Sequence, residues 1–214
     1  MSPTREQATK KKPPATKAAA KKAAVKKAPA KARGRGGTGP VAAGLLVTPG
    51  ASADRDSRTL VALEDGLDLP VERITIRSRA ARKVHEQLRE DMGDFADRLG
   101  VEPSELVIGG RSFGGRMCSM LVAAGEPVAG LVLLSYPLHP PGKPDDLRVD
   151  HFADITVPTL FVSGTADPFA TPEELERHAA AIAGPVEFVW LEGEPHAPRD
   201  DAAVVAAVAG WLRT

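Results

Sequence analysis

The chain has 214 residues, with 28 basic and 28 acidic side chains and a formal net charge of zero. This neutrality hides two unlike parts. Residues 1–39 carry twelve Lys and Arg against one Glu, a net charge of +11, and residues 40–214 carry 16 basic against 27 acidic side chains, a net charge of −11. The single cysteine excludes an intramolecular disulfide. No apolar run approaches the ~18 residues of a membrane helix, and the N-terminus lacks the apolar region of a signal peptide. We therefore expect a cytoplasmic protein without a membrane partner.

Residues 1–39 form a Lys/Ala/Pro-rich segment without aromatic side chains. Such a composition buries too little apolar surface to fold, which predicts a disordered basic tail in front of a domain at residues 40–214. The tail either serves solubility alone or binds nucleic acid non-specifically through residues 5–35, since their cations can neutralise phosphates. The second alternative implies an association with the nucleoid. A third alternative is that the tail binds an acidic protein surface.

Apolar runs and helical periodicities alternate along residues 40–214. Thr171 before Pro172 marks one helix start, because Thr is a common N-cap and Pro a common first helical residue. The order predicts an α/β fold: a mainly parallel sheet, covered by helices on both faces, that binds ligands at the carboxyl ends of its strands. The expected strands are 41–48, 71–76, 106–109, 128–135, 159–163 and 187–191, and the expected helices 57–67, 84–99, 114–124, 172–183 and 200–212.

A glycine-flanked serine follows the third expected strand. Gly110-Arg111-Ser112-Phe113-Gly114 fits G-x-S-x-G between a strand and a helix, the context of a nucleophile elbow. Small flanking residues allow the helix to cross close to the sheet, and the helix start offers free N–H groups to an oxyanion. The alternatives are an ordinary glycine-rich turn or a phosphate loop, although the Lys of a Walker A loop is missing.

Two further polar residues follow later strands, in the order that this kind of site requires. Asp167 comes directly after the strand at 159–163, and His196 after the strand at 187–191. A serine nucleophile needs a base, and the base needs an acid that orients it. Taken singly, Asp167 is equally well explained as a turn cap, and His196 as a surface-loop histidine. Together with Ser112 they predict a catalytic triad.

The remaining site predictions concern the surroundings of Ser112. We expect the backbone N–H groups of Phe113 and Ala51 to form the oxyanion hole. Because they lie in segments that follow strands, five side chains are predicted to line the pocket: Ser52, Arg111, Tyr136, His139 and Phe169. The five histidines show no metal-ligand spacing, so neither a metal nor a cofactor is predicted. The histidines expected within helices, His85 and His178, are interpreted as solvated, and Cys118 as a buried thiol.

The segments GGRSFGGR and YPLHPPGKP resemble the small lidless α/β-hydrolase-like proteins of the KANL3/Tex30 group, which are related in fold to dienelactone hydrolases. The resemblance runs from about Leu45 to the C-terminus. It implies an α/β-hydrolase fold without a lid domain, with Ser112 as nucleophile, Asp167 as acid and His196 as base. The chain departs from the group at residues 48–52, where a His-Gly-Ala-Gly type loop is usual, and at residues 77–83, which are basic here.

These patterns predict a serine hydrolase with a small acyl substrate: an ester, a thioester or a lactone. Ser112 would attack the carbonyl, His196 would take its proton, and Asp167 would hold the imidazole. The rival prediction is a hydrolase-fold scaffold without turnover, which the basic tail tethers to DNA or to an acidic partner. The altered loop at 48–52 favours the rival, and the complete Ser/His/Asp set favours the enzyme.

Overall fold

The computed structural model describes Met1 and residues 39–212. Apart from Met1 and Gly39, the predicted basic tail falls outside the described residues, and so does the predicted nucleic-acid-binding segment at 5–35. Within the described part of the chain, no helix is both long and apolar enough to cross a membrane.

Six strands form one sheet in the order β2-β1-β3-β4-β5-β6. Every neighbouring pair is parallel, so all six carboxyl ends lie at the same edge. The fold prediction of a mainly parallel sheet is confirmed. The strands are β1 (Gly44–Thr48), β2 (Val71–Arg73), β3 (Leu106–Arg111), β4 (Gly130–Leu134), β5 (Thr159–Gly164) and β6 (Val186–Leu191).

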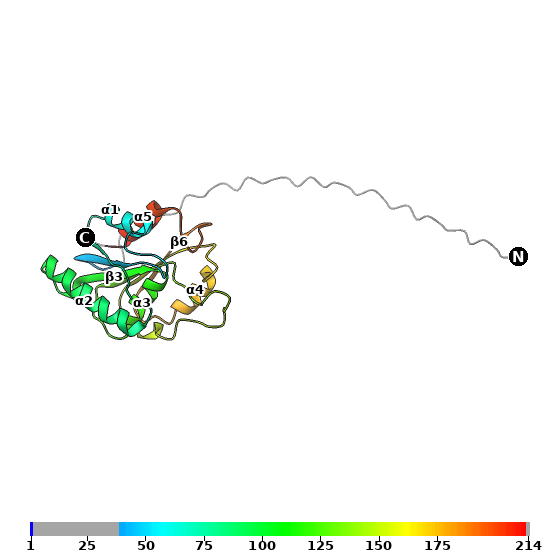
Figure 1. Cartoon of the computed structure of the whole chain (residues 1–214), viewed down its shortest axis with the longest axis horizontal. Coiled ribbons are helices and arrows are strands. Elements are labelled where there is room, and N and C mark those ends of the chain that lie inside the picture. The colour runs from blue at the N-terminus through cyan, green and yellow to red at the C-terminus, as the bar shows by residue number, and fades with distance from the viewer. Residues whose placement is uncertain (2–38, 213–214) are drawn as a thin grey trace. The chain divides into compact units, whose positions relative to one another are not determined.

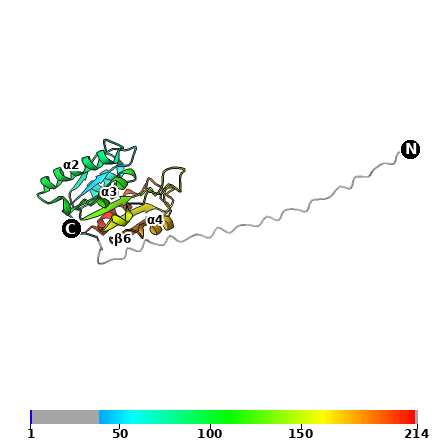
Figure 2. The same ribbon diagram turned by 90° about the horizontal axis from the view of Figure 1, so that it is seen from below.

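Helices cover both faces of this sheet. Figure 1 shows α1 (Arg58–Gly66) and α5 (Asp201–Trp211) on one face, with α2 (Ala81–Leu99), α3 (Phe113–Ala123) and α4 (Pro172–Ala179) on the other. The view from below in Figure 2 brings this second group to the front. Two short 3₁₀ turns, η1 (Pro103–Glu105) and η2 (Phe152–Asp154), complete the described elements. The arrangement is the α/β-hydrolase fold that the sequence predicts.

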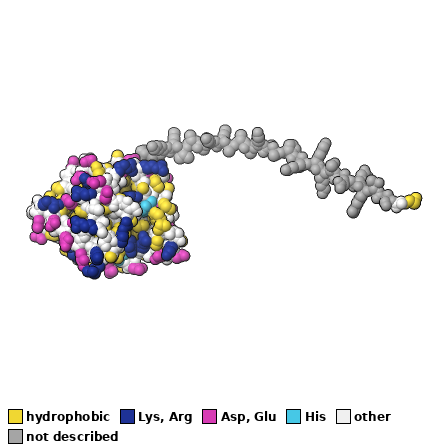
Figure 3. All heavy atoms as spheres, viewed as in Figure 1, with side chains coloured by type: hydrophobic (Ala, Val, Ile, Leu, Met, Phe, Trp, Pro, Cys, Tyr) yellow, Lys and Arg dark blue, Asp and Glu magenta, His cyan; other side chains and the backbone are white. Residues whose placement is uncertain are grey.

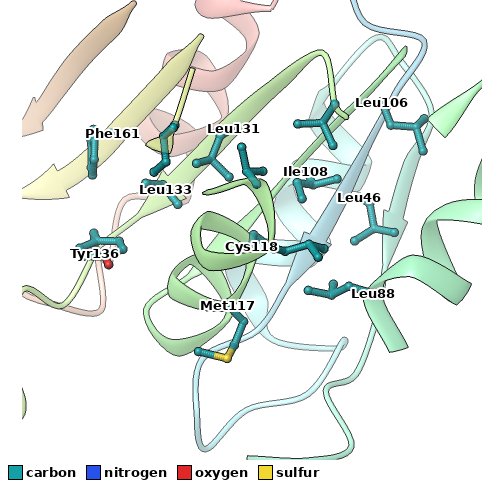
Figure 4. Close-up of a cluster of buried hydrophobic side chains, with 14 of the residues drawn as sticks. Leu46, Leu88, Leu106, Ile108, Met117, Cys118, Leu131, Leu133, Tyr136 and Phe161 are labelled. Atoms are coloured by element: carbon teal, nitrogen blue, oxygen red, sulfur yellow. The ribbon is translucent and has the colours of Figure 1, made fainter. Parts of the chain in front are cut away.

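Two hydrophobic cores result from the alternation of side chains along the buried strands. Leu46 and Ile108 point to the core under α2, α3 and α4, whereas their neighbours Leu45 and Val107 point to the core under α1 and α5. All four side chains are fully buried. Figure 4 shows the first core, where α3 packs its Cys118 against the sheet. Cys118 is buried, as predicted, and burial raises the pKa of its thiol to about 12.

Several element boundaries differ from the prediction for tertiary reasons. β2 ends at Arg73 rather than 76, because it is an edge strand whose ladder pairs only three of its residues with β1. The helix predicted at 172–183 ends at Ala179, where the chain turns so that the N–H groups of Ala183 and Gly184 both donate to the carbonyl of Ile155. Its predicted start is confirmed, since Thr171 Oγ1 accepts the N–H of Glu174 at 3.3 Å.

The start of α3 lies very close to the end of β1. A Cβ atom on Gly110 would overlap the Oγ1 and backbone atoms of Thr48, and one on Gly114 would overlap Thr48 Oγ1 and the carbonyl of Pro49. Thr48 itself is fully buried and donates from Oγ1 to the carbonyl of Gly109 at 2.9 Å. The two glycines of the G-x-S-x-G motif are therefore required by this close approach.

This contact predicts that Gly114→Ala destabilises the domain. The added methyl group meets backbone and a buried side chain, and such overpacking typically costs about 1–3 kcal/mol of unfolding free energy. The matched control is Gly93→Ala within α2, where a Cβ meets nothing within 4 Å and where Ala is favoured over Gly by about 0.5–1 kcal/mol. Urea unfolding of both variants tests this. A Gly114→Ala variant as stable as the parent would contradict the packing argument.

Candidate active site

Ser112 occupies a strained turn between β3 and α3. Its φ of 52° and ψ of −115° are rare for a residue with a side chain. The turn is held on both sides, because the Ser112 N–H donates to the carbonyl of Leu134 on β4 at 2.8 Å, and the Ser112 carbonyl accepts the N–H of Arg116 at 3.0 Å. The result is a serine hydroxyl at the carboxyl edge of the sheet, at the N-terminus of α3.

The structure brings the three residues of the predicted triad together. His196 Nε2 lies 2.9 Å from Ser112 Oγ, and His196 Nδ1 lies 2.7 Å from Asp167 Oδ2. A carboxylate can only accept a hydrogen bond, so the geometry fits a ring with its hydrogen on Nδ1 and a lone pair on Nε2 toward the serine. The Asp167 side chain is fully buried, and 17% of the His196 side chain is exposed.

Contacts between the loops after β5 and β6 fix the relative positions of Asp167 and His196. The N–H of Ala166 donates to the carbonyl of Glu194 at 3.0 Å, which ties the two loops together. Asp167 Oδ1 accepts the N–H of Phe169 at 2.9 Å, leaving Oδ2 for the histidine. The Phe169 ring stands edge-on to the imidazole with 4.5 Å between centroids. Both carboxylate oxygens of Asp167 thus accept a hydrogen bond. The orientation of the imidazole is fixed by its hydrogen bond to Asp167 and by its packing against Phe169.

The segment after β1 passes directly beside the serine. A Cβ on Gly50 would lie 3.7 Å from Ser112 Cβ, so the neighbouring Ala51 is close to the serine in space. Phe113 is the first residue of α3, where an N–H has no partner within the helix. Within residues 39–212, neither Phe113 nor Ala51 donates its N–H to another backbone group. Two free donors therefore flank Ser112, one from each of the segments predicted to supply them.

A cavity of about 490 Å³ opens over Ser112 and His196. Four of the five predicted pocket side chains lie in its wall: Ser52, Arg111, His139 and Phe169. Predicted oxyanion residues Ala51 and Phe113 line it as well. The sequence analysis did not identify five further lining residues, namely Gly50, Ala53, Pro137, Pro141 and Arg148.

Tyr136 is the exception, and its predicted place in the pocket needs correction. The side chain is fully buried in the core under α3, with its ring 5.3 Å from that of Phe152 and 6.0 Å from that of Phe161. Its hydroxyl donates to the carbonyl of Arg148 at 2.7 Å, and burial raises its pKa. Tyr136 supports the cavity wall from behind, because it holds the backbone of a residue that lines the wall.

Two arginines lie in the wall of the cavity. Burial lowers the pKa of the Arg111 guanidinium, and it does the same for Arg148. Arg111 Nη2 donates to the carbonyl of His196 over a long 3.4 Å. The basic segment at 77–83, where the chain departs from the group that it resembles, contributes no residue to this wall; its Arg79 stacks over the Phe113 ring at 5.2 Å from the centroid.

The loop from 135 to 151 carries His139 and Arg148, and a hydrogen bond between the half-buried His151 and the buried Ser119 anchors its far end. His151 Nε2 lies 2.8 Å from Ser119 Oγ on α3. Burial, assisted by Arg116, lowers the pKa of His151 from 6.5 to about 4, against the opposing charges of Asp150 and Asp154. The ring is therefore neutral at pH 7. Residues 39–212 contain no cluster of three or more His, Cys, Asp or Glu that could hold a metal ion.

The histidine of α2 differs from its prediction as a solvated side chain. Nε2 of His85 is buried, and burial lowers the pKa of this imidazole. The helix periodicity does not show this, because the backbone of Met117, which acts on this imidazole, lies on α3.

A protein-family model matches this chain. The family described as "Alpha/beta hydrolase domain" matches residues 71–202, more than half of the chain. This range includes Ser112, Asp167 and His196, and it begins after the loop that contains Ala51.

Solved structures agree on the fold. Est1E from Butyrivibrio proteoclasticus is 16% identical with a TM-score of 0.63, and the match covers 79% of this chain and 86% of Est1E. A thermophilic esterase from Thermogutta terrifontis, with malate bound, is 17% identical with a TM-score of 0.64, covering 81% and 90%. An alpha-beta serine hydrolase homologue from Coxiella burnetii is 18% identical with a TM-score of 0.62, covering 82% and 86%. At these identities the likeness establishes the fold.

The half-buried His151 predicts a specific dependence of stability on pH. Its pKa is lower in the folded chain than in the unfolded chain. Below pH 6.5, His151 is therefore protonated in the unfolded state while it stays neutral in the folded state. The contribution of His151 to stability is thus complete above pH 6.5 and is lost as the pH falls toward 4. We expect His151→Gln to cost about 1 kcal/mol at pH 7.5 and progressively less at lower pH. Urea unfolding from pH 7.5 to 4.5 tests this, and a stability difference that does not change with pH would contradict it.

Proposed function

The chain belongs to the alpha/beta hydrolase domain family, and we propose that it is a serine hydrolase that cleaves small esters, thioesters or lactones. The observation that carries this proposal is the hydrogen-bonded series from Ser112 Oγ through His196 to Asp167, with distances of 2.9 and 2.7 Å. Hydrogen-bond reach between nucleophile, base and orienting acid is the requirement for acyl transfer through a serine.

In the proposed reaction, His196 Nε2 takes the hydroxyl proton of Ser112 while Oγ attacks the substrate carbonyl. Asp167 holds the ring hydrogen on Nδ1 and stabilises the imidazolium that forms. The oxyanion of the tetrahedral intermediate accepts hydrogen bonds from the N–H groups of Phe113 and Ala51. The imidazolium then protonates the leaving group, and a water molecule, activated by the same base, releases the acyl group from Ser112.

The cavity limits the size of the substrate. Its volume of about 490 Å³ lies in the usual range for small-molecule sites, which favours a substrate of that size. The longest connection between elements beside the site is the segment of residues 135–151, and it forms part of the cavity wall. The wall is therefore built from the segments that follow the strand ends, which fits a compact acyl compound.

We also propose, from the segments GGRSFGGR and YPLHPPGKP, that the chain falls within the KANL3/Tex30 group of this family. Family membership and esterase-like structural neighbours support a hydrolase over the inactive scaffold. The altered loop at 48–52, whose sequence favoured the scaffold, still brings the backbone N–H of Ala51 to the cavity. Amide N–H groups need no particular side chain, so the departure leaves the proposed oxyanion hole usable.

A fluorophosphonate probe tests the proposal, because it reacts only with an activated serine. We expect labelling of the wild-type domain, loss of labelling in Ser112→Ala and in His196→Gln, and a fall in p-nitrophenyl acetate hydrolysis on the order of 10³-fold or more in both variants. The matched control is Ser104→Ala. Ser104 is exposed on η1, at the amino end of β3, whereas Ser112 follows its carboxyl end.

Circular dichroism should show that all three variants keep the fold. Labelling that persists in the folded Ser112→Ala variant would contradict the assignment of the nucleophile. A folded wild-type protein that neither reacts with the probe nor hydrolyses the ester would contradict the proposed function as a whole.

A further inference from the structure

The cavity wall contains basic side chains but no acidic ones among the described residues. Arg111 and Arg148 line it, together with His139 and His196, and no Asp or Glu of residues 39–212 belongs to the wall. The surroundings are different: in residues 40–214 acidic side chains outnumber basic ones by 27 to 16, and on the face shown in Figure 3 the two signs lie side by side. A cationic wall in an acidic domain is thus a local property of the site.

Neither arginine is neutralised by a partner. The ion pairs of the described residues engage Arg58, Arg73, Arg82, Arg89 and Arg98, but neither Arg111 nor Arg148. Arg111 makes one long bond to a carbonyl, and its Nε is buried without a hydrogen-bond partner in the described part of the chain. The carboxylate of Asp167 attracts Arg111 electrostatically, and that of Asp146 attracts Arg148. Neither carboxylate lies within ion-pair distance of its arginine.

Both guanidinium groups are costly to place where they are. Burial lowers the pKa of each, and a second arginine adds to the effect, Arg58 beside Arg111 and Arg116 beside Arg148. The guanidinium group stays charged in proteins and presents a planar set of donors that matches a carboxylate. An anion in the cavity would remove part of this unfavourable charge and supply the missing acceptors.

The two arginines come from different sides of the site. Arg111 precedes the nucleophile on the elbow and lies against Gly50 and the loop of His196. Arg148 comes from the loop after β4, where its carbonyl is held by the buried Tyr136 hydroxyl. A substrate bound over Ser112 is therefore within the field of both, and Arg148 is the one whose side chain has no hydrogen-bond acceptor among residues 39–212.

We propose that the cavity selects acyl substrates that carry a carboxylate group in addition to the bond that is cleaved, and that Arg148 binds this carboxylate while Arg111 adds to the positive potential. The inference rests on the proposed serine hydrolase function and names its substrate class. The reaction itself is unchanged: water adds across the acyl bond, Ser112 is regenerated, and the extra carboxylate takes no part in bond breaking.

Two matched ester pairs test the proposal. In the first, p-nitrophenyl adipate monoester carries the carboxylate on the acyl side, and its neutral match is the p-nitrophenyl ester of adipic acid monoamide. In the second, 4-acetoxybenzoate carries it on the leaving group, and its match is 4-acetoxybenzamide. We expect kcat/KM of the wild type to favour the anionic member of at least one pair by about tenfold, the scale of one charge-assisted hydrogen bond.

Variants of Arg148 assign the preference to this side chain. Arg148→Gln should lower kcat/KM much more for the anionic esters than for the neutral ones, mainly through KM, and so remove the preference; Arg148→Lys should restore part of it. The control is Arg82→Gln, on the exposed surface of α2, which should keep the preference. Equal rates for charged and neutral members of both pairs would overturn the proposal. So would an equal loss for both members in Arg148→Gln, since the guanidinium would then act on the reaction rather than on the carboxylate.

A binding measurement separates this proposal from the proposed function. Adipate binding, followed by calorimetry, does not need turnover, so it should persist in Ser112→Ala and weaken about tenfold or more in Arg148→Gln. Binding that depends on Arg148 in a protein without Ser112 reactivity would support the anion site and contradict only the hydrolase. The opposite result is a protein that reacts with the fluorophosphonate, hydrolyses charged and neutral esters at equal rates and does not bind adipate. That result would contradict only the anion site.

Discussion

Three segments meet at Thr48, and the geometry of the candidate site depends on that contact. The end of β1, the end of β3 and the start of α3 approach so closely that neither Gly110 nor Gly114 has space for a Cβ. Thr48 contributes to this approach from both sides, because its buried hydroxyl bonds the carbonyl of Gly109 and contacts the thiol of Cys118 on α3. With α3 pressed against β1, the residue between strand and helix is forced to a φ of 52°. The position of the Ser112 hydroxyl is thus a consequence of packing several residues away.

The same contact places the segment after β1 beside the serine. Residues 48–50 run along the start of α3, so the backbone of Gly50 and Ala51 reaches the site without needing a special side chain. The serine therefore lies between two sets of backbone donors, which is the arrangement that stabilises charge on a carbonyl oxygen. The cationic wall of Arg111 and Arg148 surrounds this centre, while Asp167 is enclosed behind His196. Negative charge that is part of the site is buried, and positive charge faces the cavity.

Much of this arrangement could be predicted from the sequence, because the informative residues lie directly after strands. Parallel strands end at one edge, so residues after β3, β5 and β6 meet there whatever the details of packing. This rule is enough to predict that Ser112, Asp167 and His196 lie close together. The role of Thr48 could not be predicted in the same way, since its hydroxyl bonds a residue 61 positions away and nothing in its local sequence marks it. For a related reason, Arg148 was not identified as a lining residue and Tyr136 was wrongly placed in the pocket. The path of the loop after β4 decides which of its side chains turns inward, and that path is set by the buried Tyr136 hydroxyl and the His151–Ser119 pair.

The central claim is that Ser112 is a nucleophile with a working oxyanion site made by two backbone N–H groups. A crystal structure of the protein with phenylboronic acid tests it most directly, since a boronate adopts the tetrahedral shape of the acyl-transfer intermediate. The account predicts a covalent bond from boron to Ser112 Oγ, with one boronate oxygen about 3 Å from the amide nitrogens of both Phe113 and Ala51. Boron bound to another residue, or a boronate oxygen that lies away from both amide groups, would contradict it.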